Sequence, residues 1–204
     1  MNRLPDARSA AVVLEGDPTA DEYMPTDTRL GSFGRLVLVR QRAGAVFDEE
    51  VTRVGRIVEE QLDDGYAVNI VGFRRGQDTG PLAAAISLRE PRVSRVLTVG
   101  SDLSRRRPTG RKGLPLQLQA AEWLGEYAPG QKEPGNMINV YIRPHTSIPR
   151  RGLRLPGALG VGIPMHPEGS AATVQVLFSA VPLDNMFNPS AIRRHARSFA
   201  GSNR

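Results

Sequence analysis

With 204 residues, 40% of them hydrophobic, the chain can form one ordinary core, and its length favours a single domain with extensions over two full domains. The absence of cysteine excludes disulfides, thiolate zinc sites and cysteine nucleophiles, and the absence of a long apolar run or of a basic start before an apolar segment predicts no membrane span and no secretory signal. The net charge of +6 conceals a split, since residues 1–88 carry a net charge of −4 and residues 89–204 one of +10, with 25 arginines and only two lysines in the chain.

The first 30 residues hold three prolines and six acidic residues, but only one short apolar run, Ala10–Leu14. Few apolar residues among many charges and prolines are typical of a segment without a core of its own. The sequence therefore predicts an extended acidic arm over residues 1–30.

A strand, a helix and a second strand are predicted next. Arg35–Gln41 is a short apolar run between glycines, which is typical of a buried strand. In Asp48–Asp64 the apolar residues recur at helical spacing, acidic residues at the start suit the positive end of the helix dipole, and a glycine follows the last residue. Tyr66–Phe73 again has the pattern of a buried strand. This order of elements predicts a parallel or mixed sheet.

A turn-rich loop over residues 72–80 leads to a short helix, which is predicted to begin at Pro81 and to end before Pro91. A third strand is predicted over Arg92–Gly100. A polar basic loop and a further amphipathic helix, over Pro115–Tyr127, follow it.

The back half of the chain is rich in proline. Nine of the 16 prolines lie from Pro129 onward, and the segments between them are predicted as strands: Met137–Arg143, Ala158–Ile163 and Ala172–Ser179. Alternation of apolar and polar residues is least clean in the last of these. A basic tail is predicted over residues 190–204.

Together these elements predict an α+β fold. An αβ front half with strand-helix-strand units on a mixed sheet precedes a proline-rich β back half, and both termini form extended arms. The predicted domain covers residues 31–189, with an αβ part at about 31–128 and a β-rich part at about 136–182, between the arm at 1–30 and the tail at 190–204.

The loop at 72–80 is the best candidate for an anion site. It follows a strand, precedes a helix N-terminus and holds Arg74, Arg75, Gly76 and Gly80. Its glycines match neither the P-loop nor the G-x-G-x-x-G template, so an ordinary strand-to-helix connection is the competing interpretation.

No other motif indicates catalysis. His145, His166 and His195 lack the spacing of a metal site, no G-x-S-x-G motif occurs, and the paired carboxylates of the helix at 48–64 are typical of a solvated face. We therefore expect no catalytic residue, no cofactor and no metal, and the sequence leans against an enzyme.

Three arginine patches are candidates for contact with nucleic acid or with other subunits, because guanidinium groups suit phosphate and carboxylate. Few aromatic residues lie near them, which speaks against a base-stacking platform. The patches are Arg105, Arg106, Arg107, Arg111 and Lys112; Arg143, Arg150, Arg151 and Arg154; and Arg193, Arg194 and Arg197, with Arg204 beyond them.

The charge split leaves three functional hypotheses. The leading one is a non-enzymatic structural protein of a multi-subunit particle, most concretely a phage or virus virion component, in which the acidic half of one subunit meets the basic half of the next. The alternative is a sequence-independent nucleic-acid-binding protein, and the third is an enzyme acting on a phosphorylated substrate at the 72–80 loop.

These hypotheses carry expectations about partners and location. We expect a homo- or hetero-oligomer within a larger assembly, with nucleic acid as a further partner, made in the cytoplasm and incorporated in a virion. The sequence identifies no partner, symmetry, copy number, host or substrate, and it does not separate a functional choice of arginine from GC-rich coding.

Overall fold

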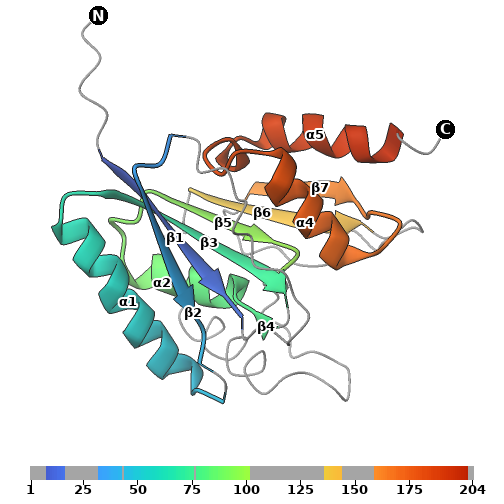
Figure 1. The fold of residues 1–204 in the computed structure, drawn as a ribbon. Helices are drawn as coiled ribbons and strands as arrows, with labels where there is room; N and C mark the ends of the chain where they lie inside the picture. Colours follow the sequence, from blue (N-terminus) through green and yellow to red (C-terminus); the bar gives the residue numbers. More distant parts are fainter. Residues whose placement is uncertain are drawn as a thin grey trace, which may run out of the picture.

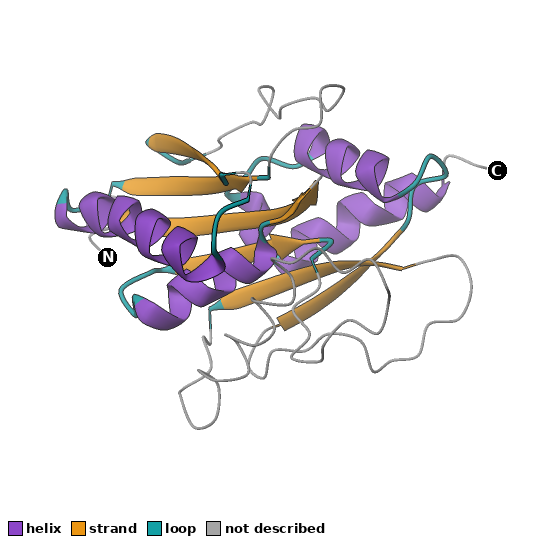
Figure 2. Cartoon of the chain, turned by 90° about the horizontal axis from the view of Figure 1, so that it is seen from below, coloured by secondary structure: helices purple, strands orange, loops and turns teal. Residues whose placement is uncertain are grey.

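A layer of parallel strands forms the middle of the molecule, with helices on both of its faces (Figure 1, Figure 2). None of the described helices is long and apolar enough to cross a membrane. The computed structural model describes residues 8–16, 32–42, 44–75, 77–101, 136–143 and 159–201.

Six strands run parallel in the order β2-β1-β3-β5-β6-β7, and the two-residue strand β4 pairs antiparallel with β3. In the centre of the sheet Val12 lies between Val37 and Ile70. The strands are β1 (Ser9–Glu15), β2 (Arg35–Arg40), β3 (Ala67–Arg75), β4 (Gln77–Asp78), β5 (Arg95–Val99), β6 (Met137–Arg143) and β7 (Leu159–Pro164).

Helices α1 (Phe47–Asp63) and α2 (Gly80–Arg89) cover one face of the sheet. In α1 the buried valines at positions 51, 54 and 58 form one stripe, as the helical period requires. Eight residues of α2, from its first glycine to Ser87, are buried, and the three alanines among them let the helix approach the strands closely.

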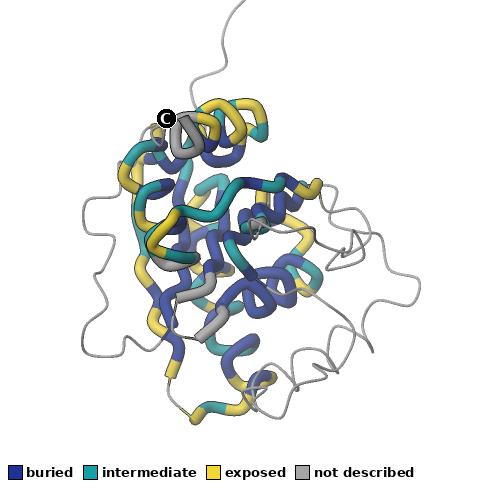
Figure 3. Tube along the Cα trace, turned by 90° about the vertical axis from the view of Figure 1, so that its right-hand side faces the viewer, coloured by how far each residue is buried: buried dark blue, intermediate teal, exposed yellow. Residues whose placement is uncertain are grey.

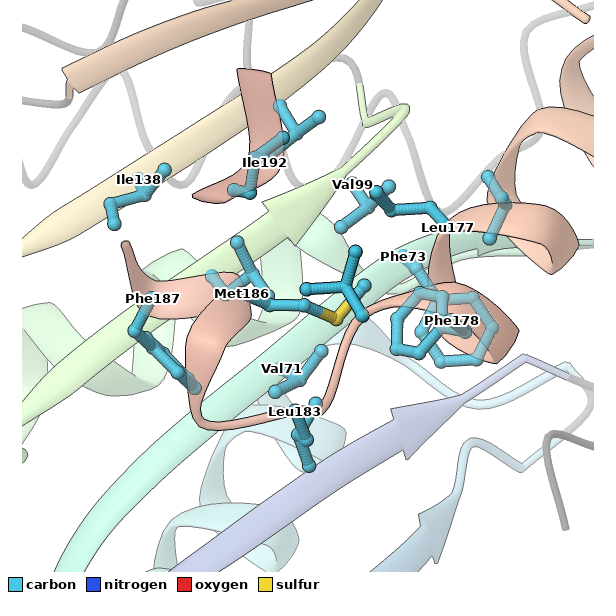
Figure 4. Close-up of a cluster of buried hydrophobic side chains, with 14 of the residues drawn as sticks. Val71, Phe73, Val99, Ile138, Leu177, Phe178, Leu183, Met186, Phe187 and Ile192 are labelled. Atoms are coloured by element: carbon cyan, nitrogen blue, oxygen red, sulfur yellow. The ribbon is translucent and has the colours of Figure 1, made fainter. Parts of the chain in front are cut away.

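Three helical segments cover the opposite face: α4 (Ser170–Ala180), the 3-10 turn η1 (Asn185–Phe187) and α5 (Pro189–Gly201). Their apolar side chains pack on β3, β5, β6 and β7, and the rings of Phe73 and Phe178 lie 5.3 Å apart between centroids (Figure 4). Along the chain trace, buried residues concentrate in the strands and in the inner sides of the helices, while the exposed ones lie outside (Figure 3).

The front-half elements lie where the sequence predicted them. Strands β2, β3 and β5 and helices α1 and α2 match the predicted segments to within a few residues, and so do β6 and β7 in the back half. The predicted helix at 115–127 lies outside the described residues.

The predicted fold class is wrong in three respects. The sheet is parallel throughout its six long strands, so the fold is α/β, with no separate proline-rich β half. The segment 172–179 lies in helix α4, because its buried residues Thr173, Val174, Leu177 and Phe178 follow helical spacing. Two segments that were assigned to arms belong to the fold: the run at 10–14 lies in β1, an inner strand of the sheet, and the expected tail from residue 190 lies in α5 as far as Gly201.

Gly72 in β3 allows the close approach of α2. A Cβ built on it would lie 2.6 Å from the backbone oxygen of Thr79 and 2.9 Å from both Ala83 Cβ and Gly80 Cα. Backbone and a packed alanine cannot move aside as a flexible side chain would, so any larger residue at position 72 must shift the helix.

We expect Gly72→Ala to destabilise the protein by about 2–3 kcal/mol, as overpacking in a dense core does. The matched control is Gly55→Ala in the middle of α1, where a Cβ meets nothing within 4 Å. That change should be stabilising by about 0.5–1 kcal/mol from helix propensity alone. Urea unfolding of both variants measures the difference, and equal midpoints would contradict it.

Candidate functional site

The carboxyl ends of the parallel strands meet at one edge of the sheet. Strand β2, the next strand along the chain after β1, lies on one side of β1 in the sheet. Strand β3 lies on the other side of β1, so the strand order reverses between β1 and β3. In open sheets of this kind, ligands bind outside the carboxyl ends of the strands at this reversal. The carboxyl edge beside β1 and β3 is therefore the first place to look for a site.

Three polar residues are buried along that edge. Glu15 is the last residue of β1, Gln41 directly follows β2, and Ser101 follows β5 after a turn at Gly100 with φ of +69°. Their exposed fractions are 3%, 4% and 2%. Among the described residues, neither the amide nitrogen nor the amide oxygen of Gln41 has a hydrogen-bond partner, and Ser101 Oγ has none either. Buried polar groups in native proteins are nearly always partnered, so these two side chains require an explanation.

The end of β2 is held firmly in place. The backbone N–H of Gln41 donates to the backbone oxygen of Glu15 at 2.8 Å, and Arg40 Nε lies 3.6 Å from Glu15 Oε2. These contacts join the ends of β1 and β2 and keep Gln41 beside Glu15.

Glu50, in the first turn of α1, is fully buried and fixes the same region from the helix side. Its Oε1 accepts from Arg42 Nε at 2.6 Å and from Arg53 Nε at 2.9 Å, and its Oε2 accepts from Arg53 Nη2 at 2.6 Å. Arg53 Nη2 also donates to the backbone oxygen of Arg40 at 2.7 Å. Burial acts to raise the pKa of Glu50, but the hydrogen bonds from Arg53 and Arg42 together outweigh it and hold the pKa below its ordinary value.

The hydroxyl of Thr79 joins β1, β3 and α2. Thr79 Oγ1 accepts from the backbone N–H of Phe73 at 3.0 Å, and lies within donating distance of the backbone oxygens of Leu14, at 2.9 Å, and Phe73, at 3.1 Å. The hydroxyl is therefore fully used in holding the strand ends, and it is not free to act as a nucleophile or to bind a ligand.

The predicted anion loop is only partly described. Arg74 and Arg75 end β3 and pair with β4, Gly80 opens α2, and Gly76 lies outside the described residues. With Gly72 packed under α2 and Thr79 bonded to the strands, the described part of the loop is a packed strand-to-helix connection. It does not support the hypothesis of a phosphorylated substrate held there.

The histidines do not form a catalytic or metal centre among the described residues. His166 follows β7, and its Nδ1 accepts from the backbone N–H of Glu168 at 3.3 Å, which places the ring proton on Nε2. His195 lies on α5, and His145 lies outside the described residues. The described part of the chain contains no group of three or more metal-ligating side chains.

Most of the predicted contact arginines cannot be placed. The set from Arg105 to Lys112, together with Arg150, Arg151, Arg154 and Arg204, lies outside the described residues, and Arg143 is the last residue of β6. The structure brings only Arg193, Arg194 and Arg197 together, as exposed residues along α5.

The acidic residues of the front half meet arginines of the same chain. Ion pairs join Asp64 to Arg35 at 3.3 Å and Asp63 to Arg92 at 3.0 Å, and Asp48 lies 4.0 Å from Arg89. Exposed pairs of this kind contribute at most about 1 kcal/mol each. They nevertheless give several acidic residues of α1 and its C-terminal end partners within the same fold.

The predicted role as a structural virion component is therefore wrong. It depended on two arms without a core and on an acidic surface that needs a basic partner, whereas β1 and α5 belong to an α/β fold, and acidic residues such as Asp63 and Asp64 form ion pairs within it. The nucleic-acid-binding alternative has no support among the described residues, where only Arg193, Arg194 and Arg197 of the predicted contact arginines lie together.

Gln41 and Ser101 were not among the sequence-derived candidates. Gln41 ends one predicted strand and Ser101 directly follows another, so a search of strand ends for polar residues would have found them. Nothing in the sequence marks them as buried or as neighbours of the strand reversal. Glu15 was missed because its strand was assigned to the arm.

Comparisons with known proteins identify no family. No protein-family model and no curated protein matches the chain. Among solved structures, the chain is similar to one described as "Marine microorganism esterase", at a TM-score of 0.45 and 10% sequence identity, over 94% of this chain and 95% of that chain. A likeness at this level carries no argument about activity, and the α/β assignment depends on the strand topology.

The buried Glu50 makes stability depend on pH. Since the folded pKa lies below the unfolded one, the unfolded state binds more protons in acid, and the contribution of this carboxylate is complete above about pH 5 and is lost as the pH falls through the lowered pKa. We expect Glu50→Gln to remove part of the acid-induced loss of stability that the parent protein shows.

The control is Glu49→Gln, an exposed neighbour in the same turn, which should leave the pH profile unchanged. Urea unfolding between pH 3 and pH 7 measures all three proteins. Profiles of identical steepness for Glu50→Gln and the parent would contradict the assignment.

Proposed function

We propose that the protein binds a small polar molecule at the carboxyl edge of its sheet, beside the reversal between β1 and β3. The observation that carries the proposal is the burial of Gln41 and Ser101 at this edge, where neither side chain has a hydrogen-bond partner in the part of the chain that the structure describes. An unpartnered buried polar group costs about 1–3 kcal/mol, and a bound ligand recovers that cost by supplying the missing partners.

The spacing of the strands gives the size of the ligand. Gln41 follows β2 and Ser101 follows β5, which lie three strands apart in the sheet. At about 4.8 Å between neighbouring strands, these two strand ends lie about 14 Å apart, and the reach of the two side chains shortens this span to the length of a molecule with one or two rings. Glu15, at the end of β1, lies between them.

The side chains also indicate the chemistry of the ligand. An amide and a hydroxyl each donate and accept hydrogen bonds, which suits hydroxyl groups on the ligand, and the Glu15 carboxylate suits an amine or another donor. We propose a hydroxyl-rich molecule that carries a basic nitrogen, such as an amino sugar or a nucleoside.

Glu15 favours acid–base chemistry over acyl transfer if turnover accompanies binding. A buried carboxylate at a ligand site can exchange a proton with a bound molecule, and Arg40 lies beside it as a balancing charge. The Thr79 hydroxyl, which lies near this edge, is bonded to the strands and is therefore not available as a nucleophile for acyl transfer.

Stability measurements without any ligand test the observation that the Ser101 hydroxyl lacks a hydrogen-bond partner. Ser101→Ala deletes a hydroxyl that bonds to nothing, so it should leave the free energy of unfolding unchanged or raise it slightly. Thr79→Val deletes a buried hydroxyl that is fully bonded, and it should cost about 1–3 kcal/mol. Equal losses in the two variants, measured by urea unfolding, would show that Ser101 has a structural partner.

Binding itself is tested by titrating the 15N-labelled protein with glucosamine, adenosine and ribose. We expect amide shifts at Gly16, Gln41 and Ser101, and a loss of affinity of about tenfold or more in Gln41→Leu and Ser101→Ala, because each loses a bond to the ligand. Gln61→Leu is the control: it changes a buried amide near the end of α1, away from the carboxyl edge, and should bind as the parent does. Unchanged binding in Gln41→Leu would contradict the proposal.

A further inference from the structure

A second cleft lies between the edge strand β7, its neighbour β6 and helix α5, away from β1 and β2. Its volume is about 450 Å³, which is in the range of small-molecule sites. It is lined by Tyr141, Gly160, Gly162, Pro164, Arg193, Ala196 and Arg197. Figure 1 shows α5 running alongside β7 at this end of the molecule.

Two glycines keep the strand side of the cleft open. Gly160 and Gly162 alternate with Val161 and Ile163, which are fully buried in the core, so the glycines occupy the other side of the strand. Glycine inside a strand weakens it and commonly marks a place where a ligand approaches the backbone. Tyr141 stands beside them: it is paired with Gly162, and a Cβ on Gly160 would lie 3.4 Å from its Cε1.

Two arginines supply positive charge on the helix side. Arg193 and Arg197 are four residues apart on α5, so their side chains lie on the same face of the helix. Both are exposed, and within the described part of the chain neither forms an ion pair or a side-chain hydrogen bond. Helix α5 contains no acidic residue, so its own sequence leaves the repulsion between the two guanidinium groups uncompensated.

We propose that this cleft binds a small oxyanion, a phosphate or carboxylate group of a small molecule, between Arg193 and Arg197. Guanidinium groups bind such oxyanions through paired N–H donors, and the anion would relieve the repulsion between the two arginines. The open glycine side of the cleft admits the anion close to the backbone. The site is independent of the one at Gln41 and Ser101, with which it shares no residue.

Calorimetric titration with pyrophosphate, inorganic phosphate and succinate at constant ionic strength tests the proposal. The pyrophosphate and succinate arms distinguish a phosphorylated ligand from a carboxylated one. We expect saturable binding of at least one of them at one site, weakened about tenfold or more in Arg193→Ala and in Arg197→Ala. The matched control is Arg194→Ala, an exposed arginine of the same helix that does not line the cleft, and its affinity should stay within about twofold of the parent.

A further variant distinguishes binding in the cleft from general electrostatic attraction to the arginines of α5. Gly160→Val places a side chain against Tyr141 on the strand side of the cleft without changing any charge, and valine is well suited to a strand. We expect it to abolish binding while thermal unfolding shows an intact fold. Absence of binding in the parent, equal loss in Arg194→Ala, or unchanged binding in a folded Gly160→Val protein would each overturn the proposal.

Discussion

The architecture depends on the close contact of Gly72 with the turn at Thr79 and Gly80. This contact sets how near α2 lies to the sheet, and the Thr79 hydroxyl then holds the ends of β1 and β3 at one level. Because β1 and β3 are the strands between which the order reverses, the same contact determines where the carboxyl edge lies. Glu15 directly follows Leu14, whose backbone oxygen the Thr79 hydroxyl contacts, and the buried Glu50 with its two arginines fixes the flank of the same region.

The arginines of this chain have two distinct roles in the structure, and the sequence alone does not distinguish them. Some, such as Arg35, Arg42, Arg53 and Arg92, form ion pairs with carboxylates of their own fold. Arg193 and Arg197 of α5 have no carboxylate on their own helix and line a cleft instead. Several of the charges that separate the two halves of the sequence are thus paired with each other within the described fold.

The sequence predicted the elements that have a strong local signal and missed those whose identity depends on distant partners. Helix α1 has a long apolar stripe and a following glycine, and both are visible without any structure. Strand β1 has five apolar residues in acidic surroundings, and only its pairing with β2 and β3 shows that it is an inner strand of the sheet. In α4 the residues Thr173, Val174 and Val176 favour a strand by propensity, but the packing of this segment against the sheet stabilises a helix. The candidate site was out of reach for the same reason, since Gln41 and Ser101 become neighbours of one edge only through the strand order.

The helices that cover one face of the sheet follow all six long strands along the chain. Val71, Leu97 and Val140 on that face pack against side chains from residues 174–196, which follow all six long strands along the chain. On the ribosome, the nascent sheet therefore exposes a broad apolar surface until α4 and α5 emerge, and such surfaces recruit chaperones or aggregate. Docking of α4 and α5, and not pairing of the strands, is therefore the step that removes this apolar surface from solvent.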